Sequence, residues 1–260
     1  MKKIEKSFAN MQELSKAGFL RYPDEFVVGY FARNSWNRVL DFGCSTGRHT
    51  KVLCELASER ETGICDIGGG QQVKLKNHII YALDLDIEVL ALAKKRAPYS
   101  VTITPEQINI IPESSLDSVL TWNCLHMNSI TEQEKIIKTF NRLLKQGGTI
   151  VSNHISTKDS KHTTNSIENI VEYKSKNRSY EIILYFYNLE KIKEIYTKNG
   201  FDIIEIYKRT KENLLNNHIV EYYLIIKKKK SCFATTWMDF EGIMLSEISQ
   251  IKKEKYCHII

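Results

Sequence analysis

The stretch Asn37–Thr50, "NRVLDFGCSTGRHT", limits the fold of this chain more than any other. Residues Arg38–Phe42 have the pattern of a short buried strand that carries an acid, Asp41, near its end, and Gly43 and Gly47 follow at once. A strand that turns through glycines into a helix places main-chain N–H groups and the positive helix terminus at the carboxyl edge of a parallel sheet. Because glycine has no side chain, we expect a ligand to approach this turn closely.

Strand and helix patterns alternate along the chain, which predicts an α/β sheet with right-handed crossovers. We expect strands at Arg38–Phe42, Ile79–Asp84, Leu116–Trp122 and Thr149–Asn153. The expected helices are Phe8–Ala17, one that starts near Pro23, Arg48–Ser58, Ile87–Lys95 and Thr131–Lys145, the last closed by "KQGG". A strand at Ser179–Tyr187, a helix at Leu189–Asn199 and two strands at Phe201–Tyr207 and Val220–Ile226 follow, the last two forming an antiparallel pair at the sheet edge.

A second acid is expected where the next strand ends. "IIYALDLD" supplies Asp84 at that point, with Asp86 as the less favoured choice. A carboxylate at this place can accept hydrogen bonds from both hydroxyls of a ribose. The glycine turn and Asp84 together predict a ligand that carries a nucleoside.

Composition excludes several classes of protein. With 260 residues, 42% of them hydrophobic and 26% charged, the chain can bury one sizeable core, and we expect one main domain. The net charge of +6 comes largely from lysine in a Lys-, Asn- and Ile-rich sequence and is weak evidence for a nucleic-acid partner. The six cysteines form no CxxC pair, which predicts no metal site, no disulfide framework and a reducing, cytoplasmic setting. We expect a soluble protein without signal peptide or membrane span.

The quoted motifs resemble those of the class I S-adenosylmethionine-dependent methyltransferases, most closely the small-molecule type. "VLDFGCSTG" is similar to the family's glycine motif with Ser45 in place of the middle glycine, "YALDLDIEVLALAKKR" to its second motif, and "FNRLLKQGGTIVSN" to its fifth strand. The resemblance implies S-adenosylmethionine as cofactor and a small-molecule methyl acceptor. The cofactor-binding residues that it implies are Asp41, Gly43, Cys44, Ser45, Thr46, Gly47, Asp84, Leu85, Gln107 and Asn123.

The resemblance also implies a fold and a division of the chain. The fold would be a Rossmann-like seven-stranded, mostly parallel sheet with helices on both faces and an antiparallel edge strand. We expect residues 1–36 to form N-terminal helices that cover the active site and residues 37–230 to form the cofactor-binding domain. Residues 231–260 have no place in that fold; they are an extra tail or an amphipathic helix, 239–252, that docks on the domain.

Two departures from the family pattern stand out. Asp84 lies 37 residues beyond Gly47, whereas the ribose acid usually follows by ~20. Residues 58–77 therefore look like an insertion, which a surface loop tolerates at little cost. The usual acid for the adenine amino group is missing, and Gln107 or Asn109 is its expected substitute.

Methyl transfer from a sulfonium needs alignment, exclusion of water and sometimes a base. His126, after the fourth strand, is the first candidate base, and a helix-start histidine satisfied by the backbone is its alternative. Tyr22 is expected to shape the acceptor pocket or simply to pack. His154 is a second candidate base, with a surface-loop histidine as the favoured alternative. Tyr185–Tyr187 form either an aromatic wall or part of the core, and Cys44 and Cys124 are expected to be small packing residues.

Three hypotheses for function follow. The leading one is methyl transfer to an O, N or C atom of a small molecule. The second is an RNA methyltransferase of the tRNA type, which would favour an Asn/Asp-Pro-Pro-aromatic motif; "WNCLHM" stands in that place instead. The third is a catalytically impaired scaffold that has lost the cofactor. The oligomeric state is open.

Overall fold

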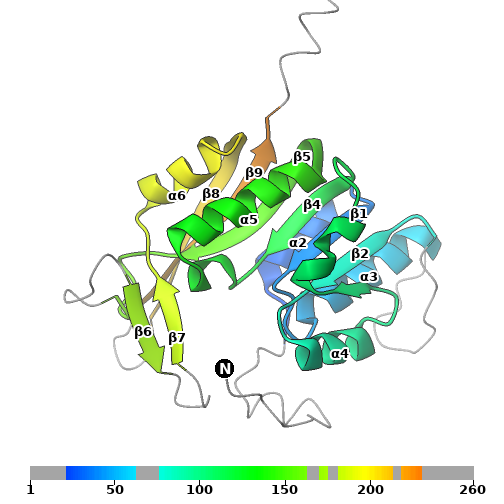
Figure 1. The fold of residues 1–260 in the computed structure, drawn as a ribbon, viewed down its shortest axis with the longest axis horizontal. Helices are drawn as coiled ribbons and strands as arrows, with labels where there is room; N and C mark the ends of the chain where they lie inside the picture. The colour runs from blue at the N-terminus through cyan, green and yellow to red at the C-terminus, as the bar shows by residue number, and fades with distance from the viewer. Residues whose placement is uncertain (1–21, 63–75, 163–169, 175–180, 213–217, 230–260) are drawn as a thin grey trace, which may run out of the picture. The chain divides into compact units, whose positions relative to one another are not determined.

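The computed structural model describes residues 22–62, 76–162, 170–174, 181–212 and 218–229 (Figure 1). The chain divides into two units, Met1–Lys228 and Lys229–Ile260. The helix expected at Phe8–Ala17 and the tail 231–260 therefore lie outside the described residues. No helix in the described ranges is long and apolar enough to cross a membrane.

The first unit contains a seven-stranded sheet in the order β3-β2-β1-β4-β5-β9-β8. Strands β1 to β5 are mutually parallel, and β9 is antiparallel to both β5 and β8. The predicted Rossmann-like fold with an antiparallel pair at one edge is thus confirmed, with β8 as the outermost strand. The strands are β1 Arg38–Phe42, β2 Ile79–Leu83, β3 Val101–Ile103, β4 Leu116–Thr121, β5 Leu144–Ile155, β8 Phe201–Glu212 and β9 His218–Lys228.

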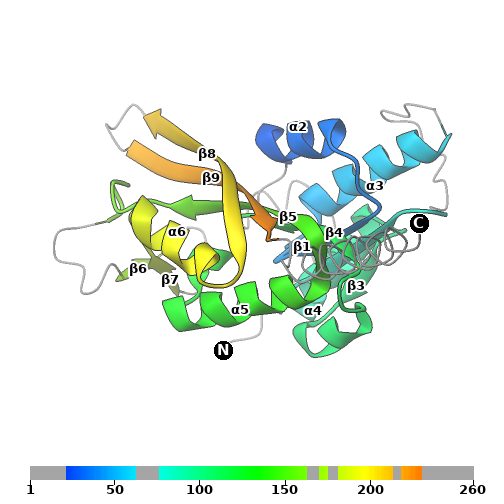
Figure 2. The same cartoon turned by 90° about the horizontal axis from the view of Figure 1, so that it is seen from above.

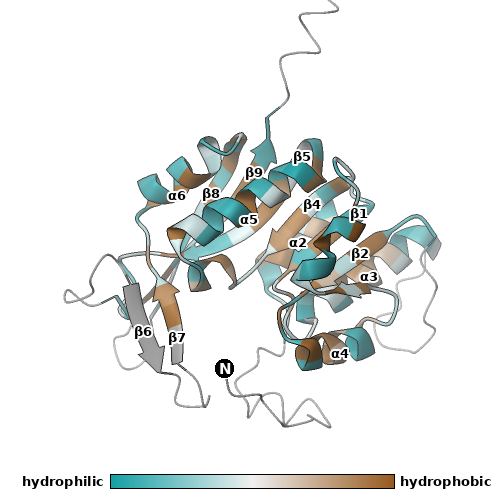
Figure 3. Ribbon diagram, in the orientation of Figure 1, coloured by the Kyte–Doolittle hydropathy of each residue, from teal (hydrophilic) through white to brown (hydrophobic). Residues whose placement is uncertain are grey.

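Helices cover both faces of this sheet, as Figure 2 shows. On one face α2 and α3 bury Phe31 and Leu53 against strand residues such as Val39. On the other face α5 and α6 bury Phe140 and Ile195. The central strands β1, β2 and β4 are hydrophobic because both of their faces are covered (Figure 3). The helices are α2 Glu25–Arg33, α3 Arg48–Thr62, α4 Ile87–Arg96, α5 Ile130–Leu143 and α6 Leu189–Thr197.

Helix α3 is longer than its sequence pattern predicts. It continues to Thr62, so residues 58–62 of the segment expected to be an insertion belong to this helix. Near its end, the Glu61 carboxylate accepts hydrogen bonds from the main-chain N–H groups of residues 76–78. Strand β2 then starts at Ile79 in direct register with Arg38 of β1. The connection between α3 and β2 therefore leaves the pairing of β1 with β2 intact.

Several other boundaries differ from the predictions; for example, β5 begins at Leu144 rather than Thr149, and β8 ends at Glu212 rather than Tyr207. Helix α5 ends at Leu143 instead of Lys145, because the buried Leu144 already pairs with Leu116 of β4. Of the strand predicted at Ser179–Tyr187, β7 occupies Glu181–Tyr185. Its antiparallel partner β6, Ile170–Lys174, had not been predicted. The remaining short elements are the 3-10 helices η1 Pro105–Ile110 and η2 Leu125–Met127.

Candidate active site

The glycine loop, residues 43–47, leaves the end of β1 in a left-handed conformation. Gly43 and Gly47 have φ angles of 72° and 77°. A Cβ atom on Gly43 would lie 2.4 Å from Sγ of Cys124, and one on Gly47 would lie 2.8 Å from Cα of Ala93. Both glycines are thus required by close contacts within the protein. The close approach of a ligand to the main chain of this turn stays a prediction.

Ser45, which stands for the middle glycine, also has a positive φ, of 51°. Its main-chain N–H donates a hydrogen bond to Oδ2 of Asp84 at 2.8 Å. Asp84 is half-buried, and its Oδ1 accepts from the N–H of Asp86 at 3.2 Å. Each carboxylate oxygen has two lone pairs, so Asp84 can still accept two hydroxyl groups. Burial raises the pKa of Asp84, and hydrogen bonds from the main chain oppose that shift.

Leu85 follows Asp84 and has 77% of its surface exposed. An exposed apolar side chain next to an acid that can accept hydrogen bonds from ribose hydroxyls suits the flat face of a nucleobase. The loop is held from the opposite side by Arg96 of α4. Its Nη1 donates to the carbonyl oxygen and the hydroxyl of Thr46, at 3.0 and 2.7 Å. The Thr46 side chain is therefore used to fix the loop.

Asp41 is buried under the loop rather than presented at the surface. Its Oδ2 accepts a hydrogen bond of 2.6 Å from the hydroxyl of Thr50 in α3. Burial raises the pKa of Asp41 to about 6, although the Thr50 hydroxyl and the Arg48 guanidinium lower it. Through this hydrogen bond Asp41 joins β1 to the first turn of α3.

The two cysteines beside the loop are packing residues in the structure. Cys44 is buried with Leu90 and Ala93 of α4. Burial raises the pKa of the Cys44 thiol, and it raises that of Cys124 to about 12. Both sulfur atoms are thus protonated at neutral pH and are poor nucleophiles.

The two predicted substitutes for the adenine acid are engaged in local contacts. The side-chain oxygen of Gln107 accepts from the N–H of Thr104 at 3.0 Å and forms the capping box of η1. The side-chain oxygen of Asn109 accepts from Nη2 of Arg142 at 3.1 Å. Each of these oxygens retains one further lone pair for a ligand.

Asn123 lies two residues after the end of β4 and has a positive φ of 56°. Its N–H donates to Oδ1 of Asn153 at 2.6 Å, and its Oδ1 accepts from Nδ2 of Asn153 at 2.6 Å. Asn153 on β5 was not predicted as a site residue. Its signal in the sequence was an amide near the end of a strand, directly before His154.

The two candidate bases lie in the interior. His126 in η2 is almost fully buried, and its Nδ1 has no hydrogen-bond partner among the described residues. Burial lowers its pKa to about 4, and Lys161 adds to the shift. His154 is buried within β5, where its Nε2 is 2.9 Å from the hydroxyl of Tyr196. The expectation of a surface-loop histidine at position 154 was wrong, because β5 extends to Ile155.

The aromatic run predicted at Tyr185–Tyr187 belongs mainly to the core. Phe186 is fully buried with Leu184 and Ile155, and Tyr187 is buried in the main hydrophobic cluster. This result agrees with the core interpretation rather than with an aromatic wall around a ligand.

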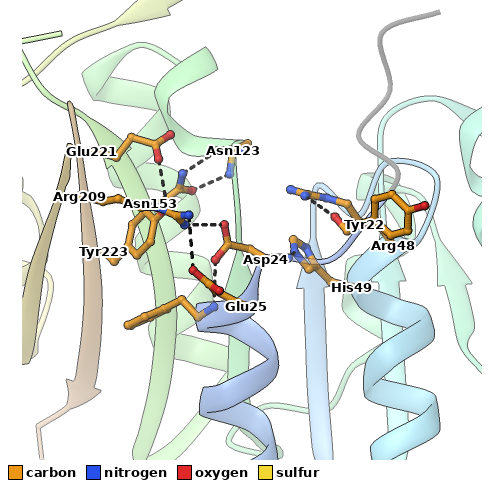
Figure 4. Close-up of polar contacts among 11 residues, drawn as sticks. Tyr22, Asp24, Glu25, Arg48, His49, Asn123, Asn153, Arg209, Glu221 and Tyr223 are labelled. Carbon is orange, nitrogen blue, oxygen red and sulfur yellow. Dashed lines mark hydrogen bonds and ion pairs between the residues drawn. The ribbon is translucent and has the colours of Figure 1, made fainter. Parts of the chain in front are cut away.

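Tyr22 lies at the start of the described chain, with 71% of its surface exposed. Its carbonyl oxygen accepts a hydrogen bond of 2.9 Å from Nη1 of Arg48, the residue that follows the glycine loop. The next contact is similar: the N–H of Asp24 donates to Nε2 of His49 at 3.1 Å. The segment before α2 is thus fastened to the first turn of α3, as Figure 4 shows.

A polar group that sequence reasoning missed lies beside this segment. We call it the Asp24 cluster; its members are Asp24, Glu25, Arg209, Glu221 and Tyr223. Arg209 of β8 pairs with Asp24 at 3.2 Å and with Glu25 at 3.5 Å, and it donates to the Tyr223 hydroxyl at 2.8 Å. The hydroxyl in turn donates to Glu221 at 3.2 Å. The available signal was an acid inside the apolar strand "HIVEYYLII".

Comparison with known proteins agrees with this geometry. Residues 34–200 match the model of a methyltransferase domain family. A search of curated proteins finds no match. A SAM-dependent methyltransferase from Methanosarcina mazei superposes with a TM-score of 0.61 at 16% identity, covering 80% of this chain and 99% of that one. The 1,6-didemethyltoxoflavin-N1-methyltransferase from Burkholderia thailandensis gives a TM-score of 0.52 at 14% identity, covering 87% and 94%.

The match to the family model identifies this chain as a methyltransferase. The chain belongs to the methyltransferase domain family whose model spans residues 34–200.

Proposed function

We propose that this enzyme transfers a methyl group to an O, N or C atom of a small-molecule acceptor. The observation that carries the proposal is the hydrogen bond from the Ser45 N–H to Asp84, which joins the glycine loop to the ribose-type acid at one sheet edge. The structural neighbour named for 1,6-didemethyltoxoflavin supports a small acceptor, because it covers most of both chains.

The residues at this edge suit S-adenosylmethionine. Asp84 keeps two lone pairs for the ribose hydroxyls, and Leu85 offers an exposed apolar surface for the base. When bound, the cofactor supplies a methyl group that is already activated for transfer. The residues proposed to hold it are Asp41, Gly43, Cys44, Ser45, Thr46, Gly47, Asp84, Leu85, Gln107 and Asn123. Asp41, Thr46 and the two glycines act by shaping the loop.

On the acceptor side we propose roles for His126 and Tyr22. The His126 ring is neutral at physiological pH because burial lowers its pKa to about 4. Its Nδ1, which lacks a hydrogen-bond partner among the described residues, can accept a hydrogen bond from the acceptor. Tyr22 is held by Arg48 beside the glycine loop, so its exposed ring can cover the acceptor.

Methyl-labelled S-adenosylmethionine tests this proposal. The purified chain is incubated with the labelled cofactor and, separately, with the small-molecule fraction and the RNA fraction of a cell extract. We expect label in the small-molecule fraction and its loss in the Asp84→Asn variant. Label that enters RNA instead would replace the small-molecule proposal with the RNA one, and label in neither fraction would contradict both.

A further inference from the structure

Glu221 occupies an unusual place for an acid. It lies on β9 opposite Ile155, at the carboxyl end of β5, and pairs across the sheet with Arg209 of β8. Its side chain is half-buried between apolar neighbours of the strand. An acid inside an apolar strand loses hydration, so its presence calls for a compensating partner.

The direct partner of Glu221 in the Asp24 cluster is a neutral hydroxyl. Arg209 can only donate hydrogen bonds, so its contact with the Tyr223 oxygen leaves the Tyr223 proton for Oε2 of Glu221. Arg209 itself pairs with Asp24 and Glu25. In the described parts of the chain, no cation lies within 4.0 Å of the Glu221 carboxylate to form a salt bridge. The Tyr223 hydroxyl orients Oε2 of Glu221, and the second carboxylate oxygen of Glu221 takes no part in the hydrogen bonds of the Asp24 cluster.

The guanidinium of Arg48, the residue that follows the glycine loop, lies within electrostatic reach of Glu221. Burial lowers the pKa of the Arg48 guanidinium, and the negative charges of Asp41, Asp24 and Glu221 oppose that shift. The Arg48 guanidinium therefore interacts electrostatically with both Asp41 and Glu221. Figure 4 shows Arg48 reaching from α3 toward Asp24 and Asn123, with Glu221 on the far side of them.

From this arrangement we propose that Glu221 binds the protonated amine of a small cationic methyl acceptor and takes a proton from it. The inference rests on the proposed function, because it places the amine next to the bound methyl donor. One proton passes from the ammonium nitrogen to the free oxygen of Glu221. The nitrogen keeps the bonding electron pair and becomes a nucleophile.

The electrostatics of Glu221 agree with this role. Burial raises its pKa, and Asp24 contributes to the same shift, while Tyr223, Lys211 and Arg209 oppose it. A carboxylate with a raised pKa is a better proton acceptor than an ordinary surface glutamate. A cationic partner would also relieve the cost of the half-buried charge.

Two cofactor analogues test the proposal without knowledge of the acceptor. S-adenosylhomocysteine has a neutral sulfur and no methyl group, whereas sinefungin carries an ammonium group where the methyl group would be. Titration calorimetry gives the affinity of each for the wild type, Glu221→Gln and Glu25→Gln. Glu25 is the matched control, because it shares Arg209 but its side chain is 87% exposed.

We expect the wild type to bind sinefungin at least about tenfold more tightly than S-adenosylhomocysteine, as a charge-assisted hydrogen bond implies. Glu221→Gln should abolish this preference without changing the affinity for S-adenosylhomocysteine, and Glu25→Gln should keep it. Tyr223→Phe, which leaves the carboxylate but removes its hydrogen bond, should reduce the preference in part. This variant provides the test even where Glu221→Gln is unstable.

Several results would overturn the proposal. The first is a wild type that binds sinefungin no more tightly than S-adenosylhomocysteine. The second is a preference for sinefungin that stays unchanged in Glu221→Gln or Tyr223→Phe. The third is an equal loss of that preference in Glu25→Gln, which would indicate only the summed negative charge of the region. Each of these leaves binding of S-adenosylhomocysteine intact. Failure of the folded wild type to bind either analogue would instead contradict the proposed function.

Discussion

The main-chain N–H of Ser45 lies 2.8 Å from Oδ2 of Asp84, although 39 residues separate them in the sequence. This hydrogen bond joins the loop after β1 to the end of β2. The ends of the two strands stay in place because Glu61 holds residues 76–78 and β2 pairs with β1 in register. The connection between α3 and β2 thus leaves this edge of the sheet intact.

Gly43→Ala should destabilise the protein strongly. The φ angle of 72° and the 2.4 Å approach of Cys124 Sγ to the new Cβ together predict a loss of about 2–4 kcal/mol in the free energy of unfolding. Urea denaturation measures this change. Gly29→Ala in α2 is the control, because its Cβ would meet only the flexible end of Arg33; a similar loss in both variants would contradict the explanation.

Ser45→Gly, in contrast, should raise the free energy of unfolding. A serine with φ of 51° is strained, and glycine at the same position relieves that strain, so we expect a gain of up to about 1 kcal/mol. Ser114→Gly, at a turn with φ of 50°, should behave alike. A loss of stability in both variants by urea denaturation would show that backbone strain is not the governing factor.

Acid should destabilise the fold through its buried histidines. Burial lowers the pKa of His126 to about 4 and that of His154 to about 3, whereas both have a pKa near 6.5 in an unfolded chain. Below pH 6.5 these histidines bind protons in the unfolded chain but stay neutral in the folded chain. The free energy of unfolding should therefore fall between pH 6.5 and about 4, by roughly 3 kcal/mol for His126 alone.

The measurement for this prediction is a series of urea titrations over that pH range. His126→Asn keeps a polar side chain but does not titrate, so its stability should depend less on pH than that of the wild type. An identical pH dependence in both proteins would contradict the assignment of His126 as a buried neutral group.

The contact between Asp24 and Arg209 should couple α2 to β8. Asp24→Asn retains the side-chain oxygen that caps α2 at Phe26, so it removes only the charge. A double-mutant cycle with Arg209→Gln should give a coupling of about 0.5–1 kcal/mol, since both side chains are mostly shielded from water. A coupling of zero in thermal or urea unfolding would mean that the ion pair does not hold α2.

The parts of the fold that local patterns encode could be predicted. The glycine loop, Asp84 and the positions of most strands follow from short stretches such as "VLDFGCSTG", because a buried strand and its turn leave a pattern in adjacent residues. The ends of α3 and α5 could not, since they depend on contacts such as that of Leu144 with Leu116.

The Asp24 cluster was beyond sequence reasoning. Asp24 and Arg209 are 185 residues apart and meet only through the sheet order, which brings β8 beside β9 and α2. Likewise, nothing local to Asn153 indicates that it holds Asn123 in its left-handed conformation. Residue type identified the loop and its acid, while the cluster around them required the tertiary fold.

The most direct test of the account is a calorimetric titration of the purified chain with S-adenosylhomocysteine, alongside Asp84→Asn and Asp41→Asn. We predict saturable binding in the micromolar range for the wild type, a loss of at least about tenfold in Asp84→Asn, and reduced fold stability in Asp41→Asn because its partner Thr50 is buried. Absence of binding to a wild-type chain that unfolds cooperatively would contradict the claim that this edge holds the cofactor.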